Sequence, residues 1–107
     1  MTLEELKDIV ATGTGIPTEI DYFDSPPKAP YIVIVDGGES ADIFADDNAV
    51  GKSLVVNLEV YTSKKIKKSV LARVRTTLDG VGVGYEQGAT SYTETERLML
   101  IPFEIFL

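Results

Sequence analysis

Two stretches of the chain carry apolar side chains in the pattern of β-strands. The run Tyr31–Val35 is apolar and largely β-branched, which predicts a strand buried on both faces that closes at Asp36-Gly37-Gly38. Between Leu54 and Tyr61 apolar residues fall at every second position, which predicts a strand with one fully apolar face. Weaker patterns predict further strands over 18–23, near 83–85 and over 92–106.

Two other stretches place apolar residues at helical spacing. The first begins at Thr2, whose side chain can form a capping box with Glu5, and it ends at Gly13 and Gly15. The second follows Ser63, a candidate N-cap. Its apolar stripe, with members mostly one turn apart, consists of Ile66, Val70, Leu71, Val74 and Leu78.

These elements predict an α+β fold. Each helix has one apolar stripe to bury, so we expect two helices packed on one face of a mostly antiparallel sheet of four to five strands. Pro102 cannot donate to a ladder, which places the last strand at an edge or in a bulge, and Gly88–Ser91 suits a hairpin turn. At 107 residues, the expected organisation is a single domain covering 1–107.

The composition excludes several kinds of chemistry. The chain has no cysteine and no histidine, which removes disulfides, the usual zinc sites, thiol nucleophiles and the usual catalytic triad. Gly51-Lys52-Ser53 resembles the end of a phosphate-binding loop, but Asp46 stands where that loop needs a glycine, and a strand follows instead of a helix. We find no catalytic constellation and expect no enzymatic activity, no cofactor and no metal site.

Charge is distributed very unevenly along the chain. The net charge is −7, yet six of the ten Lys and Arg residues lie within 63–79. Four of them, Lys64, Lys65, Lys67 and Lys68, fall in the first turns of the second predicted helix, where cations oppose the helix dipole. This placement favours docking against an acidic surface, whereas the acidic balance of the whole chain argues against general DNA wrapping.

Acidic residues gather at two other places. The segment from 36 to 48 is predicted to be an irregular loop, and its carboxylates are Asp36, Glu39, Asp42, Asp46 and Asp47. Its residues are oxygen ligands of the kind Ca²⁺ takes, but the spacing of a calcium-binding loop is absent, so a solvated loop is expected. Glu94 and Glu96 lie two apart in the predicted last strand, so both should point to one face.

The order of these pieces resembles a known family. An apolar strand follows a proline-rich connector, an acidic segment with Asp47-Asn48 comes next, and Val56-x-Leu58-x-Val60-Tyr61-Thr62 runs directly into Lys64-Lys65 and a helix. A short strand and a long one opened by Glu94-x-Glu96 close the chain. Over about residues 28–107 this pattern resembles the tail terminator, or tail completion, proteins of long-tailed bacteriophages.

The resemblance implies a structural protein of a virion or prophage particle. Such proteins form a homohexameric ring on the head-proximal end of the tail tube, stop tube growth and offer the surface that joins the head. The implied partners are other copies of the chain, the tail tube protein and a head completion or connector protein. No cofactor and no membrane is implied, DNA only passes through the ring, and the location is the virion tail, with assembly in the host cytoplasm.

The resemblance also suggests roles for the charged residues. Lys64, Lys65, Lys67 and Lys68 become candidates for subunit or tube contacts, the acidic segment becomes a ring-lining or docking loop, and Glu94 and Glu96 become strand-face contacts. Two alternatives stay open. One is another head–tail connector or minor tail protein, and the other is a small ligand-binding domain or enzyme with a pocket around Tyr61, Tyr85 and Glu94.

Overall fold

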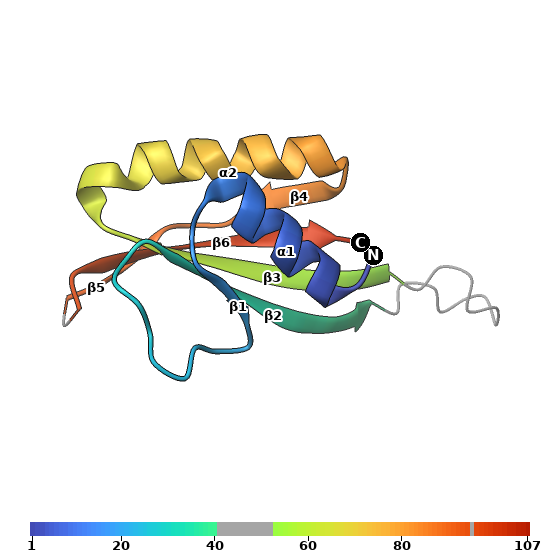
Figure 1. Ribbon diagram of the computed structural model, residues 1–107, viewed down its shortest axis with the longest axis horizontal. Helices are drawn as coiled ribbons and strands as arrows, with labels where there is room; N and C mark the ends of the chain where they lie inside the picture. Colours follow the sequence, from blue (N-terminus) through green and yellow to red (C-terminus); the bar gives the residue numbers. More distant parts are fainter. Residues whose placement is uncertain (41–52, 95) are drawn as a thin grey trace.

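The protein is a β-sheet covered on one face by two helices (Figure 1). The structure, a computed structural model, describes residues 1–40, 53–94 and 96–107. Its elements are α1 (Leu3–Thr14), β1 (Thr18–Ile20), β2 (Tyr31–Ser40), β3 (Ser53–Thr62), the 3-10 turn η2 (Lys64–Ile66), α2 (Lys67–Val81), β4 (Gly84–Gln87), β5 (Ser91–Thr93) and β6 (Leu98–Phe106). The predicted α+β class is confirmed, with six strands in the described part of the chain instead of four to five.

The sheet is antiparallel except at one edge. Its order is β1-β2-β3-β6-β4, with β5 also paired to β6, and β1 runs parallel to β2. The central strands are β3 and β6, which pair from Val55 opposite Phe106 to Thr62 opposite Met99. In the part of the chain that the structure describes, no helix is long and apolar enough to cross a membrane.

Helix α1 begins and ends as the sequence predicts. The Thr2 side chain accepts the Glu5 amide at 3.1 Å, and the Glu5 carboxylate accepts the Thr2 amide at 2.9 Å, which completes the capping box. Gly15 adopts the left-handed conformation that stops the helix, and its amide donates to the Ala11 carbonyl. Leu6 and Val10 are buried against the sheet.

Helix α2 starts later than predicted. Ser63 makes no side-chain cap hydrogen bond, because the chain leaves β3 through the turn η2 and the α-helix begins only at Lys67. Ile66 therefore lies in the turn and stays 37% exposed, whereas the rest of the predicted stripe, from Val70 to Leu78, is buried. The lysines thus span two elements, with Lys64 and Lys65 in η2 and Lys67 and Lys68 in the first turn of α2.

The core lies between the helices and the sheet. Alternate residues of the central strands point into it, and the largest fully buried side chain is Phe103. Both helices and the strands β2, β3 and β6 contribute to it, with the buried side chains Leu6, Val10, Ile32, Ile34, Val56, Leu58, Val60, Val70, Val74, Leu78, Ile101, Phe103 and Ile105. In the described ranges, the other face of the sheet carries no helix (Figure 1).

Strand β2 is longer than the sequence suggests. The Asp36-Gly37-Gly38 segment does not close it, because the strand continues to Ser40 and pairs with β3 beyond these residues. The register shifts between Asp36 and Glu39, which is how a strand accommodates an irregularity without ending. By contrast β1 is shorter than predicted and stops at Ile20, before Asp21 with its positive φ of 67°.

The predicted last strand from Tyr92 to Phe106 is in fact a hairpin. Strand β5 turns back over 94–97, where Arg97 has a φ of 54°, and pairs with the start of β6. Strands β4 and β5 both pair with β6, so the segment between them is not the hairpin turn predicted at Gly88–Ser91. It is a break in the edge strand opposite Pro102.

Pro102 explains this break. It lies in an interior strand, contrary to the expectation of an edge, with Glu59 of β3 opposite it. Its carbonyl accepts the Gly88 amide at 2.7 Å, so its missing N–H would also point to that side, since both groups of a strand residue face one neighbour. The edge strand is interrupted where proline offers no donor, and the ladder with β3 is unaffected.

Candidate functional site

The basic residues predicted as an interface gather at one end of α2. Lys64, Lys67 and Lys68 line a hollow of about 390 Å³ together with Leu71 and Arg75. Lys65 is exposed but lines neither this hollow nor the next. The structure therefore brings three of the four predicted lysines together and separates the fourth.

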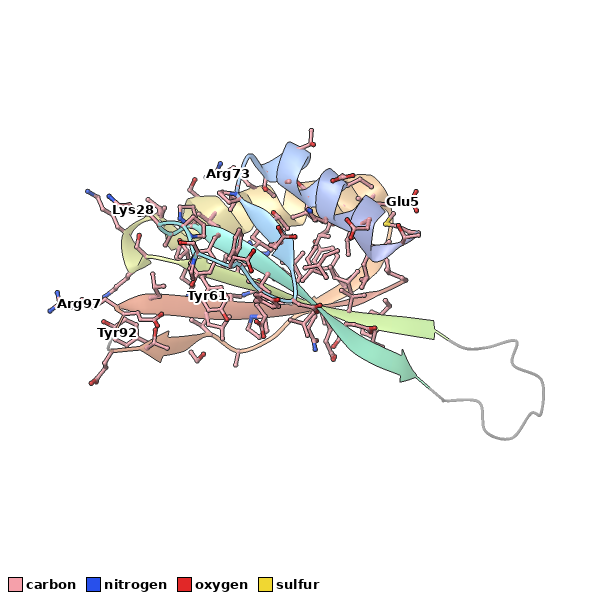
Figure 2. All side chains as sticks on the ribbon, turned by 60° about the horizontal axis from the view of Figure 1, so that its bottom comes forward. Glu5, Lys28, Tyr61, Arg73, Tyr92 and Arg97 are labelled. Atoms are coloured by element: carbon pink, nitrogen blue, oxygen red, sulfur yellow. The ribbon has the colours of Figure 1, made fainter. Side chains whose placement is uncertain are left out.

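A second hollow extends this region towards the end of the sheet. Lys64 lines it with Tyr92, Arg97 and Met99, and its volume is about 450 Å³. Figure 2 shows Tyr92 and Arg97 at the free end of the sheet, with the Arg97 side chain pointing outwards. We call Lys64, Lys67, Lys68, Arg75 and Arg97 the basic surface. Arg97 was not predicted, because only the β5–β6 turn brings it next to Lys64.

The basic surface has little to neutralise it within the molecule. Among the described residues, none of its five cations has an ion-pair partner, and its only hydrogen bond joins the Arg75 guanidinium to the Gln87 amide oxygen. Arg73 points elsewhere and has a structural role, because it donates to the Thr14 carbonyl at 2.8 Å and so ties α2 to the end of α1. Lys67 and Lys68 also oppose the dipole of α2, whose first turn has no acidic residue.

The predicted acidic loop is placed only in part. Asp36 is exposed in β2, and Glu39 belongs to the same strand rather than to a loop. Asp42, Asp46 and Asp47 lie outside the described residues. The two described positions pair with β3, with Asp36 opposite Val56 and Glu39 opposite Leu54.

Glu94 and Glu96 do not share a strand face as predicted. Both are exposed in the turn that links β5 to β6, because the chain reverses there instead of continuing as one strand. Glu96 lines a groove on the helix-free face of the sheet, whereas Glu94 does not.

No groove with this lining was predicted from the sequence. Tyr31 and Tyr61 are directly opposite each other on β2 and β3, and their rings stack at 4.7 Å with 17° between the planes. Phe23 contacts the Tyr31 ring edge-on at 5.6 Å. We call the hollow of about 420 Å³ around these rings the tyrosine groove; it is lined by Asp21, Tyr22, Phe23, Pro26, Tyr31, Val33, Glu59, Tyr61, Thr93, Glu96 and Leu100.

The electrostatics of the tyrosine groove are acidic. Its lining includes the carboxylates of Asp21, Glu59 and Glu96 and no Lys or Arg. The Tyr61 hydroxyl donates to the Glu59 carboxylate at 3.2 Å, and burial together with that carboxylate raises the pKa of Tyr61 to about 12. Burial and the negative charge of Glu96 also raise the pKa of Tyr31. Both phenols are therefore neutral near pH 7, and the carboxylates set the charge.

The pocket expected for a ligand-binding domain does not form as predicted. Tyr85 is opposite Ile105, on the helix-covered face, and its hydroxyl donates to the Asp79 carboxylate of α2 at 2.7 Å. Tyr61 faces the other side of the sheet, and Glu94 lines neither hollow that is near it. The three residues thus belong to three separate environments.

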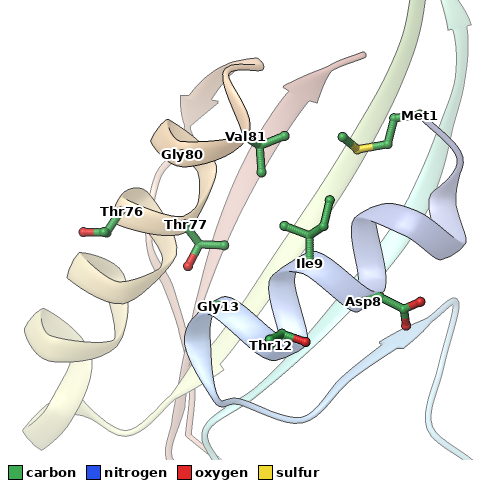
Figure 3. Close-up of a pocket in the computed structure, with 9 residues that line it drawn as sticks. All are labelled: Met1, Asp8, Ile9, Thr12, Gly13, Thr76, Thr77, Gly80 and Val81. Carbon is green, nitrogen blue, oxygen red and sulfur yellow. The ribbon is translucent and has the colours of Figure 1, made fainter.

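A further hollow of about 800 Å³ lies between α1 and α2 (Figure 3). Its walls are mostly apolar, with the half-exposed Met1 and Ile9, and Asp8 is the one carboxylate of its lining. At its floor Gly13 of α1 approaches Thr77 of α2 closely. No group of titratable side chains gathers there, so it is a packing feature rather than a site with chemistry of its own.

Comparison with known proteins was made once the geometry of the site was clear. No protein-family profile matches the chain, and a search of curated proteins finds no match. Within the described ranges there is also no group of three or more acidic, His or Cys side chains that could hold a metal ion. The two candidate surfaces are therefore the basic surface, which lies at one end of α2 and of the sheet, and the acidic, aromatic groove on the helix-free face.

Proposed function

We propose that the protein is a structural subunit of a bacteriophage or prophage tail that assembles into a ring, most specifically the homohexameric terminator on the head-proximal end of the tail tube. In this role it stops tube growth and offers the surface to which the head joins, with the tail tube protein and a head connector as neighbours. It acts in the virion and assembles in the host cytoplasm. It performs no catalysis and needs no cofactor.

The observation that carries this proposal is the basic surface. Three lysines and two arginines are held together without an ion-pair partner among the described residues. Lys67 and Lys68 also oppose the helix dipole, which costs about 0.3–1 kcal/mol each in an isolated helix. A cluster that is unfavourable within one chain becomes favourable when an anionic surface of another chain covers it, which is the situation of a protomer in an assembly.

The distribution of charge along the sequence supports the same reading. The acidic residues between 36 and 48 and the basic residues within 63–79 occupy separate stretches of the chain. In a ring the acidic segment would line the bore or the docking surface, where like charge lets DNA pass without binding.

The direct test is assembly, observed by negative-stain electron microscopy of concentrated protein and of protein mixed with isolated tail tubes, with and without Mg²⁺. Rings with sixfold averages, seated at one end of the tubes, are the expected result. Monomers that bind no tube contradict the proposal, and labelled protein at the distal tip favours a minor tail protein instead.

A variant pair sharpens this test. The triple change Lys64→Glu, Lys67→Glu and Lys68→Glu reverses the basic surface and should abolish assembly while the circular dichroism spectrum stays the same. Lys65→Glu is the matched control, because Lys65 has the same chemistry and neighbourhood but lines neither hollow, so it should assemble normally. Equal behaviour of the two variants would remove the basic surface from the assembly mechanism.

A further inference from the structure

We propose that the tyrosine groove is the surface that receives the basic surface of a second copy of this chain, so that one face of each subunit holds the other face of the next. The inference rests on the proposed ring function and names the contact between its subunits. It is carried by what the groove is made of, by where it lies, and by what the rest of the molecule leaves unpaired.

The groove has the composition of a site for a cationic side chain. Tyr31 and Tyr61 stack across β2 and β3, and Leu100 of β6, directly opposite Tyr61, lines the groove with them. An ammonium or guanidinium beside aromatic rings is attracted by their π electrons where it reaches a ring face, and partial burial strengthens the attraction. Glu96 comes from the neighbouring turn and Glu59 from the same strand, so carboxylates stand beside the ring.

The carboxylates of the groove lack a counter-ion. In the residues that the structure describes, Asp21, Glu59 and Glu96 form no ion pair, and the groove lining contains no cation. The Tyr61 hydroxyl donates to the Glu59 carboxylate but adds no positive charge. Three negative charges beside apolar ring surface therefore favour a partner that brings several positive charges, and one that also brings methylene groups to cover the rings.

The part of the basic surface on α2 fits that description and lies on the other side of the sheet from the groove of its own chain. Lys67, Lys68 and Arg75 belong to α2, which covers one face of the sheet (Figure 1). Tyr31, Glu59 and Tyr61 alternate with the core residues of β2 and β3 and therefore stand on the opposite face. The long side chains of lysine carry both the charge and the methylene groups that the groove lacks. The cations of α2 and the carboxylates of the groove lie on opposite faces of one molecule, so they pair between two molecules.

The geometry of this pairing has a consequence for the assembly. The two patches differ, so the contact is heterologous, and a pair of subunits keeps one free groove on one member and one free basic surface on the other. Such contacts repeat head to tail until the series closes into a ring or continues as a filament. The contact therefore supplies the type of interface that a cyclic assembly requires.

The test exchanges the charges of the two patches. The groove variant carries Glu59→Lys and Glu96→Lys, and the surface variant carries Lys64→Glu, Lys67→Glu and Lys68→Glu. Each alone should lose about a hundredfold or more in association constant, because like charges then face each other at every contact. Mixed in equal amounts they should associate again, since the positive groove of one accepts the negative surface of the other, and an alternating ring of six closes.

The controls and readouts separate this inference from the proposed function. Glu94→Lys is the matched control, because Glu94 lies in the same turn as Glu96 but outside the groove, and it should associate like the original chain. Association is measured by sedimentation velocity, and the ring signals of Tyr31 and Tyr61 are followed by NMR up to millimolar concentration. Restored association in the mixture, with tyrosine signals that shift, is the expected result.

Three outcomes overturn one conclusion or the other. Sixfold rings formed equally by the groove variant refute the groove contact and leave the terminator proposal standing. Restored pairing that yields filaments or another ring size supports the contact and refutes the sixfold terminator. Tyrosine signals that do not change with protein concentration, but shift when an oligolysine peptide is added, refute the second copy as occupant and identify the groove as the site of another cationic partner.

Discussion

Gly13 of α1 lies in close contact with α2, and replacing it by alanine tests how tightly the two helices are packed. A Cβ on Gly13 would lie 2.6 Å from Thr77 Cγ2 and 2.8 Å from Thr77 Oγ1. Thr77 has little freedom to move away, because it is β-branched within α2 and its hydroxyl donates to the Arg73 carbonyl at 2.9 Å. The backbone at Gly13 is helical, so alanine itself suits the local conformation.

Two opposed effects set the magnitude. Overpacking of this kind lowers the free energy of unfolding by about 1–3 kcal/mol, and the higher helix propensity of alanine over glycine raises it by about 0.5–1 kcal/mol. We therefore expect Gly13→Ala to be about 1 kcal/mol less stable, with a Tm lower by about 5 °C for a domain of this size. Gly80→Ala is the matched control, because Gly80 is helical too and has no atom within 4 Å of its Cβ position. It should gain about 0.5–1 kcal/mol.

Urea unfolding followed by circular dichroism measures both variants. The double variant Gly13→Ala with Thr77→Ala removes both methyl and hydroxyl from the close approach and leaves only the Thr77 Cβ, at 3.3 Å. It should regain the lost stability, so a double-mutant cycle should give a coupling of about 1 kcal/mol or more. Equal stabilisation by Gly13→Ala and Gly80→Ala would refute the close packing of the helices.

Three further changes test other parts of the molecule. The pKa of Tyr61 is raised from the ordinary value of 10.0 to about 12, so the stabilisation that this phenol contributes is complete below pH 10 and is lost as pH rises through 12. Stability measured by urea unfolding should therefore decline less across that pH window in Tyr61→Phe than in the original chain. An equal decline in both proteins contradicts the assignment. Thr2→Ala removes the capping box and should cost about 1 kcal/mol in thermal unfolding, whereas Thr2→Ser should cost little. Lys67→Glu or Lys68→Glu should stabilise dilute monomer by about 0.3–1 kcal/mol at low salt, because an anion suits the first turn of α2; destabilisation would mean that the lysines support the isolated fold.

Most of the fold could be read from local patterns in the sequence. The capping box at Thr2, the alternation before Tyr61 and the stripe from Val70 to Leu78 each depend on residues within a few turns of one another, and each appears as predicted. The errors arose where pairing between distant strands decides. Tyr92–Phe106 reads as one long strand, but its first part gains a ladder only by folding back on β6.

The functional surfaces divide in the same way. Three lysines of the basic surface were visible as a charge run, but Arg97 joins them only through the β5–β6 turn. The tyrosine groove depends on the register that sets Tyr31 opposite Tyr61, and on Glu96 leaving the strand to stand beside them. Strand alternation puts Tyr61 on the face away from the apolar one, but the run at Tyr31 was predicted to be buried on both faces, and no local signal fixes the cross-strand register.

The interruption of the edge strand opposite Pro102 bears on how copies of this protein would meet in the proposed assembly. The edge formed by β4 and β5 is divided there and offers no long run of free backbone donors and acceptors, whereas at the other edge β1 covers only Ile32–Ile34 of β2. Sheet-to-sheet extension, the step that makes aggregation hard to reverse, is therefore disfavoured at the β4–β5 edge. The contact proposed between copies is made by charged side chains on the two faces, so salt should dissolve the proposed assembly and its removal should reform it.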